Sequence, residues 1–169
     1  MAVARDQLVE LTSDPVPFLE DDDPVLRRLA VTALSEEQAR AHIGAVTLLA
    51  GDDDVAVRSA AAEKLGVCGK EHFETLASLQ DDEEPTVREA VATAYGEMGS
   101  PESVDWLIDA ATNAADRHVR EAAVAALGAI GDPRAIDALL EIIRNGPPQV
   151  RRRTIAAITV FDDERIEPA

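Results

Sequence analysis

The stretch HVREAAVAALGAIGDPRAIDALLEIIR, residues 118–144, decides the fold because variants of it recur along most of the chain. It contains an apolar run, a stop at Gly-Ala-Ile-Gly, a new start at Asp-Pro and a second apolar run. A Val-Arg dipeptide, once Leu-Arg, marks each copy at steps of 31, 30, 32 and 31 residues, with arginines at Arg27, Arg58, Arg88, Arg120 and Arg151. A fixed period of this length indicates stacked supersecondary units.

Each unit has the pattern of a helix, a tight turn and a second helix. Residues 85–99, PTVREAVATAYGEMG, place apolar side chains at helical spacing on one face. Pairs of glycines predict the end of this first helix, at Gly66 and Gly69, Gly96 and Gly99, Gly128 and Gly131. An N-cap residue followed by proline, at Ser100-Pro101 and Asp132-Pro133, predicts the start of the second helix.

The chain of 169 residues is long enough for one domain, 1–169, built as a short array of such units. We expect a degenerate N-terminal cap in 1–20, repeats in 21–50, 51–80, 81–113 and 114–145, and an incomplete last repeat in 146–169. Apolar residues make up 46% of the chain but aromatic residues only 3%, so small aliphatic side chains must form the core. The predicted fold is an all-α solenoid of about five helix pairs.

The motif D-x-x-VR-E-A-A-x-x-A-L-G-x-I-G-D-P-x-A-I-x-x-L, from Asp116 to Leu139, resembles the short HEAT-like repeat of the phycobiliprotein-lyase type. The resemblance implies an α-solenoid with the first helices on its convex side and the second helices lining its concave side. It also implies a polar ladder between neighbouring repeats, made by the five repeat arginines and by Asp23, Asp54, Glu84 and Asp116. The family contains chromophore lyases, enzyme-accessory subunits and plain binding scaffolds, so the resemblance does not fix an activity.

An acidic residue stands four positions before each of the first four repeat arginines, whereas the fifth unit has Pro147. We expect these acids to cap the first helices and to complement their dipoles, although a row of acidic ligands is the alternative. The proline predicts that the last interface differs from the others. The four acids are Asp23, Asp54, Glu84 and Asp116.

The formal charge of −17, from 33 acidic and 16 basic residues, argues against nucleic acid and favours a basic partner. No window is apolar enough for a membrane span, and we expect a cytoplasmic protein. Only two of the bases are lysines, a bias that either a salt-rich cytoplasm or a GC-rich genome would produce. Cys68 shares its slot with Met98, Ile130 and Phe161, so it is expected in the core.

No arrangement of residues indicates catalysis. The three histidines, His42, His72 and His118, fall at unrelated slots of the repeat, and no phosphate-binding loop or nucleophile triad is present. We therefore expect no catalytic residue, no metal ligand and no cofactor.

The second helices carry the candidate binding site. Trp106 lies beside the apolar stripe of its helix, in a ridge of carboxylates that we expect on the concave side. Such a surface favours a basic segment of another protein, with Trp106 as its anchor; the alternative is that Trp106 simply packs between adjacent second helices. The predicted partner-binding residues are Glu74, Glu102, Asp105, Trp106, Asp109, Asp137 and Glu141.

The sequence therefore predicts a non-catalytic interaction scaffold. The alternative is a lyase-like or enzyme-maturation subunit that acts on a chromophore- or cofactor-bearing protein. At the C-terminal end, the apolar residues Ile155, Ile158 and Val160 lack a following helix to cover them. We expect a second copy of the chain, as a homodimer, or a longer natural protein to cover this face.

Overall fold

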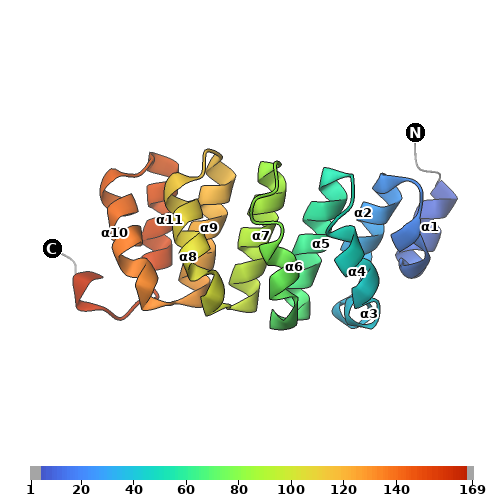
Figure 1. Cartoon of the computed structure of the whole chain (residues 1–169), viewed down its shortest axis with the longest axis horizontal. Helices are drawn as coiled ribbons and strands as arrows, with labels where there is room; N and C mark the ends of the chain where they lie inside the picture. The colour runs from blue at the N-terminus through green and yellow to red at the C-terminus, as the bar shows by residue number, and fades with distance from the viewer. Residues whose placement is uncertain (1–4, 167–169) are drawn as a thin grey trace.

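The computed structural model describes residues 5–166, and every regular element in this range is a helix. The helices lie side by side in chain order and form an elongated array (Figure 1). This arrangement confirms the predicted α-solenoid of about five helix pairs. The elements are α1 (Arg5–Ser13), η1 (Val16–Glu20), α2 (Pro24–Ala33), α3 (Glu36–Ala41), α4 (Ile43–Leu49), α5 (Val55–Cys68), η2 (Lys70–His72), α6 (Phe73–Ala77), α7 (Pro85–Met98), η3 (Pro101–Ser103), α8 (Val104–Asn113), α9 (Arg117–Ile130), η4 (Pro133–Ala135), α10 (Ile136–Asn145), α11 (Pro148–Ile158) and η5 (Glu164–Ile166).

The helices form two rows. The first row holds the Val-Arg helices α2, α5, α7, α9 and α11, and each of these packs on the next. The second row holds α4, α6, α8 and α10, and each of these packs on the Val-Arg helix that follows it in the chain. At the N-terminal end, α1 and η1 pack on α2 as a cap, while residues 1–4 lie outside the described range.

Capping by aspartate starts most of the first helices. The carboxylates of Asp23, Asp54 and Asp116 accept hydrogen bonds from backbone N–H groups in the first turns of α2, α5 and α9. Glu84 holds the same position before α7, but its side chain makes no capping bond, contrary to the expectation. The extra methylene of glutamate explains this difference, because it carries the carboxylate past the N–H groups.

The second helices begin later than the sequence indicated. Ser100-Pro101 and Asp132-Pro133 open the single 3-10 turns η3 and η4, and α8 and α10 follow these turns. Asp132 caps its turn through the N–H of Arg134. The hydroxyl of Ser100 instead donates to the carboxylate of Glu102, so Ser100 does not cap.

Glycine and alanine let the first helices approach closely. A Cβ on Gly66 of α5 would lie 2.6 Å from the Cα of Ala94 in α7, and one on Gly96 would lie 3.0 Å from the Cα of Ala126 in α9. We expected Gly66 and Gly96 to end their helices, but they lie inside α5 and α7. The later glycines end the helices, as at Gly99, whose φ is 57°.

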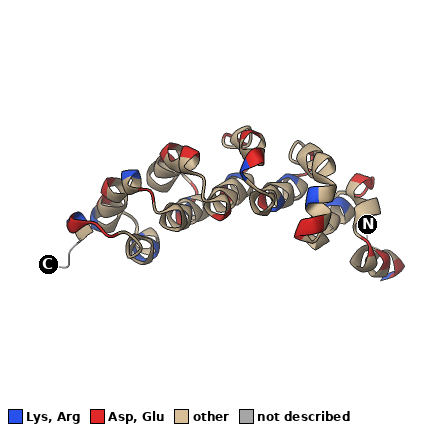
Figure 2. Ribbon diagram, turned by 90° about the horizontal axis from the view of Figure 1, so that it is seen from below, with Lys and Arg blue, Asp and Glu red and all other residues tan. Residues whose placement is uncertain are grey.

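This close packing sets the direction of the curve. In Figure 2 the ends of the array bend away from the row of α4, α6, α8 and α10, which therefore forms the outer arc. The expectation that the second helices line the concave side is wrong. The row with the closest contacts must be the shorter row, and the shorter row of an arc lies on its inside.

The core runs between the two rows along the whole array. Val57, Val87 and Val119, which precede the repeat arginines, are each completely buried, and so are Leu65, Tyr95 and Leu127. Cys68 is buried in the same core, as predicted. At the C-terminal edge Ile158 is buried, whereas Ile155 and Val160 remain 53% and 61% exposed.

Candidate functional site

The tryptophan of the predicted site belongs mainly to the core. The Trp106 ring in α8 is partly buried and meets the Tyr95 ring edge-on, with the ring centroids 5.8 Å apart. Tyr95 in turn lies 5.2 Å from the Phe73 ring, and its hydroxyl accepts a hydrogen bond from Gln80. Burial raises the pKa of Tyr95 to about 12. The ring therefore packs on the core, but against Tyr95 of the first-row helix α7, whereas the packing alternative placed it between neighbouring second helices.

Two acids of the predicted ridge pair with arginines that also bind a second carboxylate, Asp132 in the case of Arg134 and Asp163 in the case of Arg165. Asp105 pairs with Arg134 at 3.1 Å, and Asp137 pairs with Arg165 at 2.8 Å. Both pairs are exposed and join neighbouring repeats, through Arg134 of η4 and Arg165 of η5. The other four acids of the ridge are exposed. Glu102 accepts a hydrogen bond from Ser100, Asp109 accepts one from Asn113, and Glu141 accepts one from Asn145. Glu74 accepts no such bond within residues 5–166. Because this ridge lies on the outer row, it does not form a concave surface.

The arginine ladder exists, but its carboxylates are not the capping acids. Arg27 binds Asp52 of the next repeat through Nε and Nη2, both at 2.8 Å, and Arg58 binds Asp82 at 2.9 and 3.1 Å. Burial alone would raise the pKa of Asp52 and of Asp82, but hydrogen bonds from the arginines and from nearby backbone N–H groups hold each pKa below its usual value. A bidentate, largely buried pair of this kind fixes the register of neighbouring repeats.

The ladder stops after two pairs. Arg88 donates from Nη1 to the carbonyls of Asp82 and Glu83, as Arg27 and Arg58 donate to the corresponding carbonyls of their own repeats. The position that corresponds to Asp52 and Asp82 in the next repeat is Ala114, so Arg88 has no carboxylate partner there. Arg120 donates to the carbonyl of Ala114, and Arg151 is exposed in α11. The last two interfaces of the first row therefore lack the arginine–aspartate pair.

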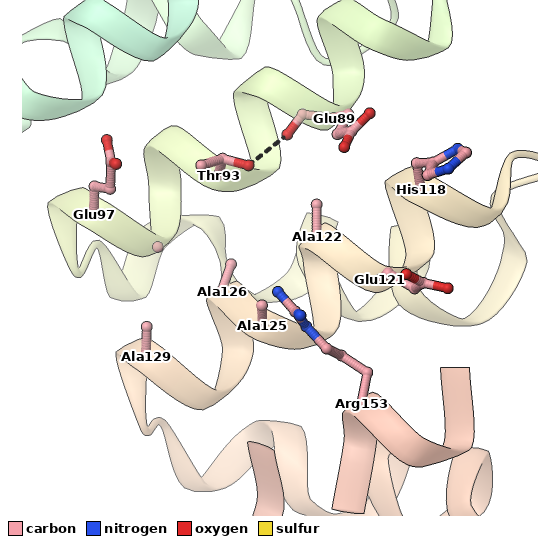
Figure 3. A pocket seen from close by; sticks show the side chains of 11 residues that line it. Glu89, Thr93, Glu97, His118, Glu121, Ala122, Ala125, Ala126, Ala129 and Arg153 are labelled. Carbon is pink, nitrogen blue, oxygen red and sulfur yellow. Dashed lines mark hydrogen bonds between the residues drawn. The ribbon is translucent and has the colours of Figure 1, made fainter. Parts of the chain in front are cut away.

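The inner surface of the first row carries an elongated groove, which we call the inner groove. One hollow of about 470 Å³ lies between α7, α9 and α11 (Figure 3), and a second of about 410 Å³ lies across α2, α5 and α7. The two share Thr93 and Glu97. Alanines of α9 form much of the floor of the first hollow, namely Ala122, Ala125, Ala126 and Ala129.

The middle of the inner groove is acidic. Glu63 of α5 and Glu89 and Glu97 of α7 line it, and the side chains of all three are free of ion pairs and hydrogen bonds within residues 5–166. Lys64 lines the same hollow, but its ammonium group donates to the carbonyls of Thr32 and Leu34 and forms no ion pair with the three carboxylates.

The three carboxylates also affect one another. Burial by the surrounding helices raises the pKa of Glu63, the negative charges of Glu97 and Glu89 raise it further, and Lys64 opposes the shift. Burial likewise raises the pKa of Glu97. Both side chains are still accessible at the surface, so a ligand could reach them. Carboxylates whose pKa is raised by burial and by neighbouring like charges are typical of functional sites.

The α11 end of the groove is basic. In Figure 3 the Arg153 side chain extends from α11 over the alanine floor of α9. Arg117, Arg152 and Arg153 border a further hollow at this end, where Glu121 is the one carboxylate. Glu121 lies 3.6 Å from Arg117, so its charge is already partly balanced.

These groove residues were not among the predicted site residues, although the sequence contains a signal for them. On a helix, positions one, five and nine after each repeat arginine share a face. In α7 these positions hold Glu89, Thr93 and Glu97. The periodicity alone does not show that this face lines a groove, because it does not show which row lies inside the curve.

The comparisons with known proteins agree with the fold. A family model described as HEAT repeats matches residues 73–159, about half of the chain. This chain belongs to the HEAT repeat family. No curated protein matches it. Among solved structures, a designed armadillo repeat protein in complex with peptide (KR)4 is similar, with a TM-score of 0.62 and 18% identity over 93% of this HEAT repeat chain and 85% of that chain.

A second similar structure is that of computationally designed armadillo repeat proteins for modular peptide recognition. It has a TM-score of 0.58 and 19% identity, with the same coverage of both chains. At these identities the likeness shows the fold alone. Within residues 5–166 of the HEAT repeat protein, no helix is long and apolar enough to cross a bilayer, and no group of three His, Cys, Asp or Glu residues could hold a metal ion.

Proposed function

We propose that this HEAT repeat protein is a binding scaffold whose inner groove holds an extended, basic segment of a partner protein. The observation that carries the proposal is the set of three carboxylates that form no ion pair within residues 5–166, Glu63, Glu89 and Glu97, in the middle of the groove. A lysine or arginine side chain placed among them would supply the missing positive charge.

The floor of the groove suits an extended chain. Alanine side chains leave room for a peptide backbone to lie close to α9, and Thr93 offers a hydroxyl beside it. An extended segment advances about 3.3 Å per residue, so it can present side chains to successive helices of the row. A similar solved structure also supports a basic segment as the partner, since that designed armadillo repeat protein is in complex with the basic peptide (KR)4.

The test is a titration with a labelled octapeptide of alternating lysine and arginine, followed by fluorescence anisotropy. The groove variant is Glu63→Gln with Glu97→Gln. Each exposed ion pair contributes about 0.5–1 kcal/mol, so the double variant should bind about fivefold to thirtyfold more weakly. Circular dichroism would show that the variant remains folded.

The matched control is Asp109→Asn with Glu141→Gln, which removes the same charge from the outer row. We expect this control to bind within about twofold of the wild type, because the field of distant exposed charges is screened by salt. Equal weakening by both double variants would mean that net charge attracts the peptide and that the groove does not bind it.

Two finer expectations belong to the same proposal. We infer that the repeats are of the short phycobiliprotein-lyase type, on the support of the motif at Asp116 to Leu139. Self-association through the C-terminal edge stays a prediction, supported by the exposed Ile155 and Val160. Gel filtration over a range of concentrations, with Ile155→Lys as the variant, would test it.

A further inference from the structure

The inner groove changes sign along its length. Its middle carries Glu63 on α5 and Glu89 and Glu97 on α7. Its α11 end carries Arg152 and Arg153, with Arg117 at the start of α9. No described carboxylate pairs with Arg152 or Arg153, whereas Arg117 has Glu121 at 3.6 Å. The groove therefore offers an unpaired negative centre and an unpaired positive end.

The other end of the groove differs. Arg28 of α2 borders a hollow there together with Asp53, Asp54 and Glu63. In that hollow the three acids outnumber the single base, so the α2 end does not repeat the positive character of the α11 end. The charge order along the groove is consequently asymmetric.

We propose that the partner segment has mixed charge, with basic residues over α5 and α7 and a carboxylate over Arg153 of α11. This inference rests on the proposed function, and it adds the charge order of the segment. A purely basic segment would place a lysine or arginine beside Arg153 and lose affinity there. A guanidinium group in an open groove is well suited to a carboxylate, which it can bind through two parallel hydrogen bonds.

The spacing of the two charges follows from the helix packing. Neighbouring helices of a packed row lie about 8–10 Å apart, so α7 and α11 are separated by roughly 16–20 Å. An extended chain covers this distance in about five or six residues. The acidic residue should therefore follow or precede the nearest basic residue by about that number of positions.

Three peptides of one composition test the charge order. Each has four lysines, four serines and two glutamates, with blocked ends. The first peptide has the order lysines, serines, glutamates from its N-terminus, and the second has the reverse order. In the third peptide the two glutamates are placed between lysines. Because the net charge is the same, differences in affinity report the order alone.

We expect one of the first two peptides to bind about threefold to tenfold more tightly than the third peptide, since a segment lies in the groove in one direction. Arg153→Glu should abolish or reverse this preference. The matched control is Arg151→Glu, which makes the same charge change on α11 at an exposed position that does not line the groove. It should keep the preference.

Two results would overturn the inference. One is equal affinity for all three peptides in the wild type, and the other is a preference that survives Arg153→Glu. Either result would overturn the charge order alone. The proposed function would still stand if the lysine–arginine octapeptide binds and the double variant Glu63→Gln with Glu97→Gln weakens that binding. If that octapeptide does not bind at all, the proposed function itself fails.

Discussion

Replacing Gly66 by alanine would test the packing that gives the array its curve. The added Cβ would lie 2.6 Å from the Cα and 2.7 Å from the Cβ of Ala94. Neither of these atoms can rotate away, because one belongs to the backbone and the other is attached directly to it. Helices α5 and α7 would therefore have to separate by several tenths of an ångström.

The size of the effect is a difference between two opposing contributions. Alanine stabilises a helix by up to about 1 kcal/mol relative to glycine. Overpacking a closed interface costs about 1–3 kcal/mol, and a clash with the backbone falls toward the upper part of that range. We expect a net loss of about 1–2 kcal/mol in the free energy of unfolding, equivalent to a melting temperature lower by roughly 2–8 °C.

Gly44→Ala in α4 is the matched control. A Cβ at Gly44 would have no atom within 4 Å, so only the helix preference changes and stability should stay the same or rise. Urea unfolding followed by circular dichroism would measure both variants. A Gly66→Ala protein as stable as the Gly44→Ala protein would refute the close contact between the first helices.

Three further predictions concern the charges. Ala114→Asp should give Arg88 a carboxylate partner like those of Arg27 and Arg58. We expect urea unfolding to show a free energy of unfolding higher by about 0.5–1 kcal/mol. No gain in stability would mean that Arg88 does not reach the new side chain. Glu97→Gln should raise the melting temperature at pH 7, because burial raises the pKa of Glu97 in the folded protein and its ionised form therefore opposes folding. This advantage is largest above the raised folded pKa and should vanish as the pH falls below the unfolded value of about 4.3, so a benefit that persists in acid would contradict the sign. The melting temperature of the wild type should rise with added potassium chloride, because the Debye length falls from about 8 Å at physiological salt to about 3 Å at molar salt and repulsion between carboxylates is screened. An unchanged melting temperature would show that repulsion among the acidic residues behind the net charge of −17 does not limit stability.

The periodic residues made the fold predictable. Val57, Val87 and Val119 recur at one slot of the repeat and are all fully buried, and the capping role of Asp23, Asp54 and Asp116 followed from the same register. These features depend on residues close in sequence or on the repeat period. Local rules of helix capping and helical spacing are sufficient to predict them.

The inner groove was not predictable in the same way. Trp106 and the acids around it form a conspicuous pattern, yet that helix lies on the outer arc. Among the residues that line the inner groove, Glu63, Glu97 and Arg153 are far apart in sequence and form no conspicuous pattern in their own helices. Their common position depends on which row lies inside the bend.

The sequence by itself determined the repeat, the helical class and the buried face of each helix, because these depend on the order of apolar, capping and glycine residues within about thirty positions. The tertiary structure alone decided the direction of the curve and therefore which charges face one another. The physical reason is the contact of Gly66 with Ala94 and of Gly96 with Ala126, which shortens one row relative to the other. The residue pattern within a single helix does not show how closely that helix approaches its neighbours in the same row.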